Sequence, residues 1–332
     1  MGRVDRAAGS FYGLAFGDSL AKPTEFLSVE QIEQRYGDGP DRLEGDPALV
    51  TDDTQMALAV AWALRDASGL TPEALEPRLR ERFVAWAHSP DNNRAPGMTC
   101  LRAVGGLAEG LPWTAATMPA SKGCGANMRV TPVGLVPGLD LDLLAGISQL
   151  QAAMTHGHPT APAASELTAL ATRLLVDGAD LVDLPALLLD RCASERERYR
   201  ADWLGELWEV AGAASPVAFA RAGWDECAAA LQVLVDVLSR PDDGADPCLG
   251  TGEGWIAEEA LATALQCAVR HADDPVAALV RAARTGGDSD SIAALAGAFA
   301  GAAHGMAGWP QDWVGRIEYA DQLAALTGAP IR

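Results

Sequence analysis

The chain is short of positive charge, of paired cysteines and of long apolar runs, and each shortage excludes a class of protein. Its 332 residues include 25 Lys and Arg against 45 Asp and Glu, which gives a formal net charge of -20. An acidic surface repels nucleic acid and anionic membranes, so we expect non-specific binding to neither. The six cysteines contain no CxxC pair, which favours reduced, mostly structural thiols of a cytosolic protein.

Signals for secretion or membrane insertion are also missing. The first residues lead into a glycine-bearing helix without an uninterrupted apolar region or a cleavage site, so no signal peptide is expected. The apolar run at 292–305 is shorter than the roughly 20 residues that a membrane-spanning helix needs. We therefore expect a cytoplasmic protein with no membrane partner.

Alternating β-branched residues are nearly absent, whereas Ala and Leu dominate between Gly, Pro and Asp breaks, which predicts an almost entirely helical chain. No linker or composition shift divides it, so we expect one all-α domain over 1–332, an orthogonal helical globule. Irregular segments that could carry a site are expected at 88–97, 119–137 and 240–255. The predicted helices are 4–19, 28–36, 53–68, 72–87, 98–109, 140–155, 160–177, 183–191, 202–213, 216–239, 256–271, 275–284, 291–305 and 310–327.

Two aspartates begin the most apolar of these helices. Asp288 and Asp290 belong to Gly-Asp-Ser-Asp-Ser at 287–291, directly before a run with no charged face. Acids are common at helix N-termini, where free N–H groups and the helix dipole favour negative charge, so capping is one explanation. A helix that is apolar on every side is expected to be buried, however, and buried carboxylates need a partner or must be neutral.

A second apolar helix follows Thr51-Asp52-Asp53-Thr54. Thr51 can cap that helix, which accounts for one side chain but not for both aspartates. If the two helix starts meet, their carboxylates and hydroxyls form an all-oxygen cluster, which suits a pair of Mg²⁺ or Mn²⁺ ions better than zinc. The predicted metal ligands are Thr51, Asp52, Asp53, Asp288, Asp290 and Ser291.

Taken together and in order, the motifs of this chain resemble the ADP-ribosylglycohydrolases, the family named for the dinitrogenase-reductase-activating glycohydrolase. Residues 13–26 resemble the family's Gly-Asp-Ala-Leu-Gly-x-Pro-x-Glu segment, and 123–134 resemble its glycine-rich Gly-Ala-x-Met-Arg-x-x-Pro-x-Gly loop. The two aspartate motifs resemble its metal motifs, and 155–159 and 254–261 also have counterparts. The departures are Ala21 in place of a glycine, and Ser289 and Ser291 in place of threonines that also carry a hydroxyl.

The resemblance implies an all-α fold with a dinuclear metal site in a central cleft. There the ribose hydroxyls of ADP-ribose would bind the metals and a water would attack C1″. Glu25 would be a gate or a general base, forming the catalytic set with Asp53 and Asp288. The glycine-rich loop, which is otherwise explained as a connector, would approach the substrate closely through its backbone. Its predicted substrate-binding residues are Gly123, Gly125, Asn127, Met128 and Arg129.

We therefore expect a Mg²⁺-dependent hydrolase that removes ADP-ribose from a modified acceptor. The alternatives are a catalytically altered member that binds ADP-ribose or is structural, and a metal-dependent phosphoester hydrolase. The four aspartates favour an enzyme, because unneutralised carboxylates without a use would destabilise a core. The loops carry no code that selects among arginine, serine, an acetyl ester and a nucleic-acid base as acceptor. The oligomeric state is equally open.

Several other polar residues have weaker or structural interpretations. Asp18 is expected to orient a loop, and Asn92 and Arg94 are weak substrate candidates. His156 and His158 are expected to cap carbonyls as readily as to touch substrate. A further candidate is Trp255, which could line an adenine or ribose pocket.

Glycines recur every four residues in the first helix and again in the helix that follows Asp290. Residues four apart share a helix face, so each set makes a groove without side chains. Drift toward small residues in an alanine-rich chain is the alternative. If the grooves are used, the two helices pack closely and bring the 18–25 segment near the second aspartate motif. The two sets are Gly9, Gly13 and Gly17, and Gly297, Gly301 and Gly305.

Overall fold

The computed structural model describes residues 1–328, which form helices and no β-strand. The first half of the chain contains α1 (Arg3–Ala21), α2 (Val29–Tyr36), α3 (Asp52–Asp66), α4 (Pro72–Ala87), α5 (Met98–Ala108), α6 (Trp113–Ala116), η1 (Cys124–Ala126), α7 (Thr131–Leu135), α8 (Leu141–Ala153) and α9 (Thr160–Asp177). The second half contains η2 (Leu181–Asp183), α10 (Leu184–Glu195), α11 (Ala201–Leu204), α12 (Leu207–Val210), α13 (Pro216–Leu238), α14 (Cys248–Thr251), α15 (Ala257–Arg270), α16 (Pro275–Ala283), α17 (Ser289–His304), η3 (Met306–Gly308), α18 (Gln311–Arg316) and α19 (Ala320–Thr327).

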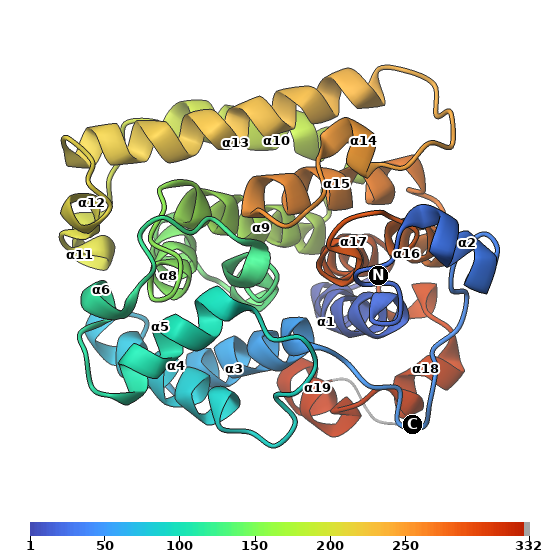
Figure 1. The fold of residues 1–332 in the computed structure, drawn as a ribbon, viewed down its shortest axis with the longest axis horizontal. Coiled ribbons are helices and arrows are strands. Elements are labelled where there is room, and N and C mark those ends of the chain that lie inside the picture. Colours follow the sequence, from blue (N-terminus) through green and yellow to red (C-terminus); the bar gives the residue numbers. More distant parts are fainter. Residues whose placement is uncertain (329–332) are drawn as a thin grey trace.

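Helices α1 and α17 lie side by side and are seen almost end-on in Figure 1. They form the most extensive helix–helix contact of the described residues. Every residue from Ala8 to Ala21 in α1, and from Ser289 to Ala302 in α17, is buried. Polar side chains on these stretches are therefore buried as well, which matters because both helices carry acids.

Glycine makes this contact possible. A Cβ atom on Gly9 would lie 2.5 Å from the carbonyl oxygen of Gly301, and one on Gly13 would overlap the carbonyl group of Gly297. Gly17 faces the backbone of α17 in the same way. The predicted close packing of the two glycine grooves is thus confirmed, and backbone meets backbone along three turns of each helix.

The remaining helices surround this pair. Helices α15 and α16 pack against α17, and the long α13 lies across α15 and α9 along the upper edge of Figure 1. Helices α3, α4, α5 and α8 occupy the other side of the molecule. Helix α3 contacts both α1 and α17, so the start of α3 can meet the start of α17.

The predicted all-α fold is confirmed, with two helices divided. Residues 202–213 form α11 and α12, which separate at Gly205, where φ is 49°. Residues 310–327 form α18 and α19. The helix is interrupted between them because the Arg316 carbonyl accepts a hydrogen bond from Ala48 N, at 2.7 Å, instead of one from its own helix. Both breaks depend on turn geometry or on a distant segment, which helical periodicity does not reveal.

The segments predicted to be irregular also contain short helices. Helix η1 and helix α7 lie within 119–137, and α14 lies within 240–255. Across residues 1–328, no helix has the length and apolarity that crossing a membrane would require.

Replacing Gly301 by alanine should destabilise the fold, because its Cβ would overlap the backbone of Gly9. We expect the free energy of unfolding to fall by about 1–3 kcal/mol, the usual cost of overpacking. The control is Gly105→Ala in α5, where a Cβ meets no atom within 4 Å. This control should leave stability unchanged or raise it by up to about 1 kcal/mol. Chemical denaturation of both variants measures the difference, and equal stabilities would contradict the packing account.

Candidate functional site

Asp18 joins the end of α1 to the start of α3. Its Oδ1 accepts a hydrogen bond from Thr51 N at 2.8 Å, and its Oδ2 accepts bonds from Thr54 N at 3.0 Å and Thr54 Oγ1 at 2.5 Å. These groups are buried, and the amides belong to a helix N-terminus that would otherwise lack acceptors. Asp18 therefore fixes the start of α3, in agreement with its expected structural role.

Thr51 is the N-cap of α3, as predicted, because its Oγ1 accepts a bond from Asp53 N at 3.4 Å. The same hydroxyl lies 3.3 Å from Asp53 Oδ2. Asp52 accepts a bond from Gly97 N at 3.2 Å, which ties the 88–97 loop to the site. The first turn of α3 thus holds Asp53 through its backbone amide and Asp52 through its carboxylate.

The structure brings the acids of the two helix starts together. The four aspartates of the two motifs are buried, with Asp288 the most exposed of them at 9%. The charge of Asp290, at the start of α17, acts on both Asp52 and Asp53 at the start of α3. It also acts on Glu25, which forms a side-chain hydrogen bond with Asp290. Six carboxyl groups, counting Glu25 and Asp18, therefore share one region between α1, α3 and α17.

Burial raises the pKa of every member of this cluster, and the charge of Asp290 raises the pKa of the others further. Burial first and the charge of Asp290 second raise the pKa of Asp52 to about 8 and that of Glu25 to about 9. The same two causes place the pKa of Asp53 and of Asp288 well above the ordinary range of a carboxyl group. None of the main influences on these groups comes from an arginine or lysine. The cluster has no cation of its own among the described residues.

The oxygen atoms of the acid cluster are of the kind that a hard cation prefers as ligands. Asp53 Oδ1 is buried without a hydrogen-bond partner. The other acids pair among themselves, since Asp290 is bonded to both Glu25 and Asp288. Within residues 1–328, no group of three or more His, Cys, Asp or Glu side chains is arranged to hold a metal ion. An all-oxygen set with an orphaned carboxylate oxygen is nevertheless the chemistry that Mg²⁺ or Mn²⁺ takes.

The loop before α15 links the start of α17 to the glycine-rich loop. Asp288 N donates to the Glu253 carbonyl at 2.8 Å, and a Cβ on Gly287 would overlap that same carbonyl group. Two residues on, the Trp255 carbonyl accepts a bond from Cys124 N at 3.0 Å. Residues 253–255 therefore run between the acids and the glycine-rich loop.

The glycine-rich loop contacts the acid-bearing helix through its side chains. Met128 Sδ lies 3.9 Å from Ser291 Oγ, at the start of α17. Burial raises the pKa of the Cys124 thiol, and the charges of Asp288 and Asp53 raise it further. Gly123 and Gly125 are partly exposed, so their backbone is open to a ligand at the edge of the acid cluster.

Arg129 and Asn127 are anchored in the core, and their predicted contact with substrate stays a prediction. Arg129 is completely buried and donates to Gln151 and Thr155, with its guanidinium 4.3 Å from the centre of the Phe83 ring. Asn127 is also completely buried, and its Nδ2 donates to the Ala257 carbonyl at 3.0 Å. Both residues anchor the loop in the core. A family motif marks them as important without telling an anchor from a contact.

The weaker candidates also have structural roles. Arg94 pairs with Glu318 and donates to the Val50 carbonyl at 2.6 Å, which holds the segment before α3. Asn92 Nδ2 donates to the Ala87 carbonyl at the end of α4. His156 is buried and lies 2.8 Å from Thr155 Oγ1, and burial lowers its pKa to about 3. His156 is therefore neutral at physiological pH.

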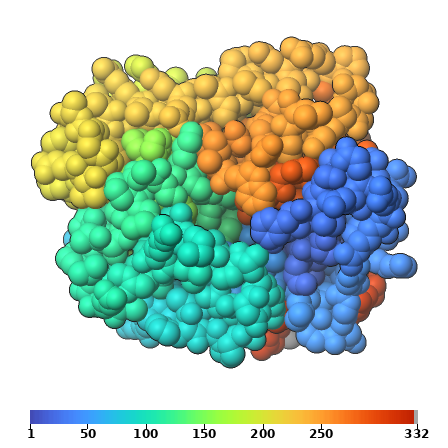
Figure 2. All heavy atoms as spheres, viewed as in Figure 1, coloured from blue at the N-terminus to red at the C-terminus, as the bar shows by residue number. Residues whose placement is uncertain are grey.

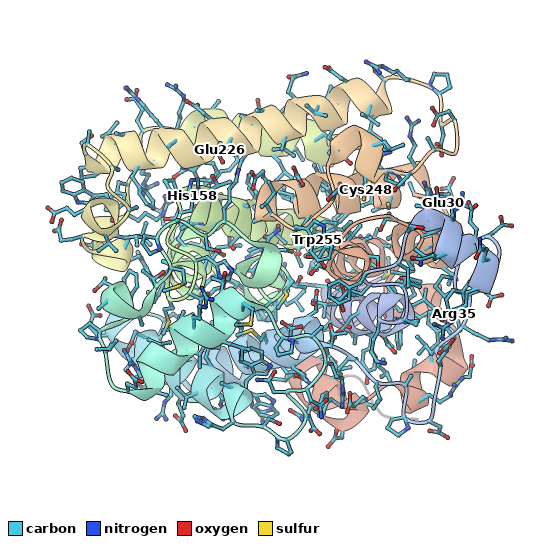
Figure 3. The ribbon with its side chains drawn as sticks, in the orientation of Figure 1. Glu30, Arg35, His158, Glu226, Cys248 and Trp255 are labelled. Carbon is cyan, nitrogen blue, oxygen red and sulfur yellow. The ribbon has the colours of Figure 1, made fainter. Side chains whose placement is uncertain are left out.

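Trp255 is a candidate from the sequence, but its stacking partner, Phe26, is not. The Phe26 and Trp255 rings stack with centroids 5.8 Å apart, and they are 66% and 40% exposed. Phe26 directly follows Glu25 and has φ of 64°, a strained value for a residue with a side chain. Trp255 is labelled near the centre of Figure 3, and Figure 2 shows a recess on this face between teal, orange and dark blue segments.

Comparison with known proteins identifies the family of this chain. The family model for ADP-ribosylglycohydrolase matches residues 1–331. The chain therefore belongs to this family. A solved structure titled ADP-ribosylglycohydrolase-related protein complex aligns with a TM-score of 0.66 and 26% identity, over 98% of this chain and 96% of that chain.

Relatives in several organisms support the assignment. The chain is 27% identical to the ADP-ribosyl-[dinitrogen reductase] glycohydrolase of Rhodospirillum rubrum, over 98% of this chain and 97% of that protein. It is 27% identical to the ADP-ribosylarginine hydrolase Tri1 of Pseudomonas putida, over 97% and 77%. An uncharacterized protein of Archaeoglobus fulgidus is 36% identical over 149 residues, which span 43% of this chain and 47% of that protein.

The raised carboxyl pKa values predict a pH-dependent stability in the absence of metal. Between the ordinary carboxyl pKa and the raised values, which reach about 9 for Glu25, the folded protein binds more protons than the unfolded chain. The free energy of unfolding should therefore fall as pH rises. Urea denaturation in EDTA from about pH 7 to about pH 8.5, above the histidine range, measures this slope.

Asp290→Asn is the informative variant for this slope, because the charge of Asp290 acts on every other acid of the cluster. The substitution should flatten the slope, as should added Mg²⁺. A wild-type slope of zero or of opposite sign would show that the cluster is not strained at neutral pH.

Proposed function

We propose that this protein is a metal-dependent hydrolase that releases ADP-ribose from a modified acceptor by cleaving the bond at ribose C1″. The observation that carries the proposal is the buried acid cluster at two helix starts, which has no cation of its own within residues 1–328. These buried carboxylates favour an enzyme over a protein that only binds ADP-ribose or has a structural role, because each unneutralised carboxylate destabilises the core.

The predicted metal ligands belong to the starts of two different helices. Thr51, Asp52 and Asp53 come from the start of α3, and Asp288, Asp290 and Ser291 come from the start of α17. Two bound Mg²⁺ ions would neutralise the cluster, orient the ribose hydroxyls and lower the pKa of water. Asp18 keeps α3 in position for this role but makes no bond to substrate itself.

Glu25 is the proposed proton-transfer group. It is partly exposed, it is hydrogen-bonded to Asp290, and burial with the nearby charges raises its pKa to about 9. Without metal, a carboxyl group in this setting holds a proton at neutral pH. Metal ions that neutralise the neighbouring acids would lower this pKa, so that the proton can be exchanged with water or a leaving group. Its position on the loop after α1 also allows it to move when substrate enters.

The rest of ADP-ribose would extend from the acids toward the glycine-rich loop. The backbone of Gly123 and Gly125 is the open part of that loop, and residues 253–255 connect it to Asp288. The exposed Trp255 ring lies on this route and could line an adenine or ribose pocket. In this arrangement, the hydrogen bonds of Arg129 to Gln151 and Thr155 hold the glycine-rich loop in place.

The acceptor is a separate question, and the relatives suggest where to begin. One relative that covers most of the chain is named an ADP-ribosylarginine hydrolase, and another is named for ADP-ribosyl-dinitrogen reductase. ADP-ribosylarginine is therefore the first substrate for a panel that also includes serine, acetyl-ester and nucleic-acid-base linkages. Release of free ADP-ribose identifies the acceptor, whereas release of phosphate would favour the phosphoester-hydrolase alternative.

Asp288→Asn should abolish turnover. The variant removes a predicted metal ligand, and even outer-shell changes at metal sites cost about 10–100-fold, so we expect a loss of about 100-fold or more. Asp190→Asn on the exposed face of α10 is the matched control and should retain activity. Chromatographic assay of free ADP-ribose, with EDTA and with Mg²⁺ restored, measures both variants. Full activity of Asp288→Asn in EDTA would refute the metal mechanism.

Glu25→Gln should separate catalysis from binding. The amide cannot transfer a proton, so we expect kcat to fall by about 10²- to 10⁴-fold. The amide is neutral and nearly isosteric with the carboxyl group, so the Kd for ADP-ribose should stay unchanged or fall. Single-turnover kinetics and calorimetry measure the two quantities. A variant that retains kcat but binds ADP-ribose weakly would make Glu25 a binding residue instead.

A further inference from the structure

A second cavity lies at the opposite ends of the helices that carry the acids. It has a volume of about 470 Å³, which is within the range of roughly 300–1,000 Å³ typical of small-molecule sites. Its walls come from the first half of α1, the end of α3, α7 with the turn after it, and α19. The main apolar residues are Phe11, Ala61, Leu64, Leu70, Leu135 and Leu326.

This cavity is separate from the acid cluster. Phe11 precedes Asp18 by two turns of α1, and Ala61 follows Asp53 by two turns of α3, which places the lining roughly 10 Å or more along each helix from the acids. No residue of the predicted metal or substrate set lines it. A ligand here would therefore not be the substrate of the hydrolase.

The charge of the lining is opposite to that of the whole protein. The formal net charge of the chain is -20, yet among residues 1–328 the cavity is lined by two arginines, Arg3 and Arg65, and by no acid. Arg3 is already paired with Asp177. Arg65 is exposed, stacks on Trp62 at 4.8 Å and has no carboxylate partner within residues 1–328.

The neighbouring acid does not satisfy Arg65. Asp66 pairs with Arg82 instead. Among the described residues, the Arg65 guanidinium donates one long bond, of 3.4 Å, to the Ala325 carbonyl, which leaves most of its donors open there at the rim. An apolar interior with an unpaired cation at its rim is complementary to a molecule that has one apolar chain and one anionic end.

We propose that this cavity binds a free single-chain anionic amphiphile, an acyl carboxylate of medium length. The chain lies among the apolar lining, and the carboxylate lies beside Arg65. Each methylene that is buried should strengthen binding about fourfold. The charged end adds a charge-assisted hydrogen bond with the guanidinium, which a neutral head group does not form.

Calorimetry with hexanoate, octanoate and decanoate tests the apolar part of the site. We expect affinity to rise about fourfold for each added methylene. Gly69 lines the cavity, has no left-handed φ and has no atom within 4 Å of the position of a Cβ, so Gly69→Trp should fill the space and abolish decanoate binding. Gly315→Trp is the matched control, because Gly315 is exposed outside the cavity with equally open space.

The charged part is tested by decanoate against decanamide, which has the same chain without the charge. Decanoate should bind the parent about tenfold more tightly, and Arg65→Gln should remove that difference. Arg42→Gln, at another exposed arginine, should keep it. Unchanged decanoate binding in Gly69→Trp, or equal affinities of the two ligands for the parent, would overturn the proposal. If Gly69→Trp fails to fold, the comparison of Arg65→Gln with Arg42→Gln still tests the proposal.

Discussion

Everything at the proposed site depends on the contact between two backbones. Helices α1 and α17 approach so closely that a single Cβ on Gly13 or Gly297 would overlap the opposite helix. This spacing places the end of α1, with Asp18 and the loop to Glu25, against the start of α17, with Asp290. Glycine within a helix costs roughly 1 kcal/mol relative to alanine, so the repeated glycines are stabilising only because the two helices meet. Packing and chemistry therefore share one constraint.

The second constraint is electrostatic. Six carboxyl groups occupy a region where burial alone disfavours charge, and each ionised neighbour makes the next ionisation harder. The fold does not relieve this tension with arginine, although the chain has many arginines and uses Arg94 and Arg129 nearby. These two arginines are bonded to residues outside the acid cluster instead. Arg94 pairs with Glu318, and Arg129 donates to Gln151. Cations are thus present around the cluster but are used to support it.

Much of this arrangement could be predicted from the sequence, because local rules apply to it. Glycines four apart and acids at the starts of apolar helices depend on helix geometry and capping, and the structure has both helix starts side by side. Arg129 could not be placed in the same way. An arginine is expected at a surface or on a ligand, and only the tertiary fold shows its donors spent on Gln151 and Thr155. The same holds for Phe26 and Trp255, whose stacking joins two distant loops.

The close pairing of α1 with α17 also sets an order of events during synthesis. The first helix leaves the ribosome early, but its partner begins only at Ser289. At 5–20 residues per second, α1 waits roughly 15–60 s before its glycine groove can be covered. During that time Asp52 and Asp53 have no Asp290 beside them, so the emerging chain does not yet contain the crowded cluster of charge. The electrostatic repulsion in the site appears only when residues from Asp288 onward are made, once the rest of the core is available to hold it.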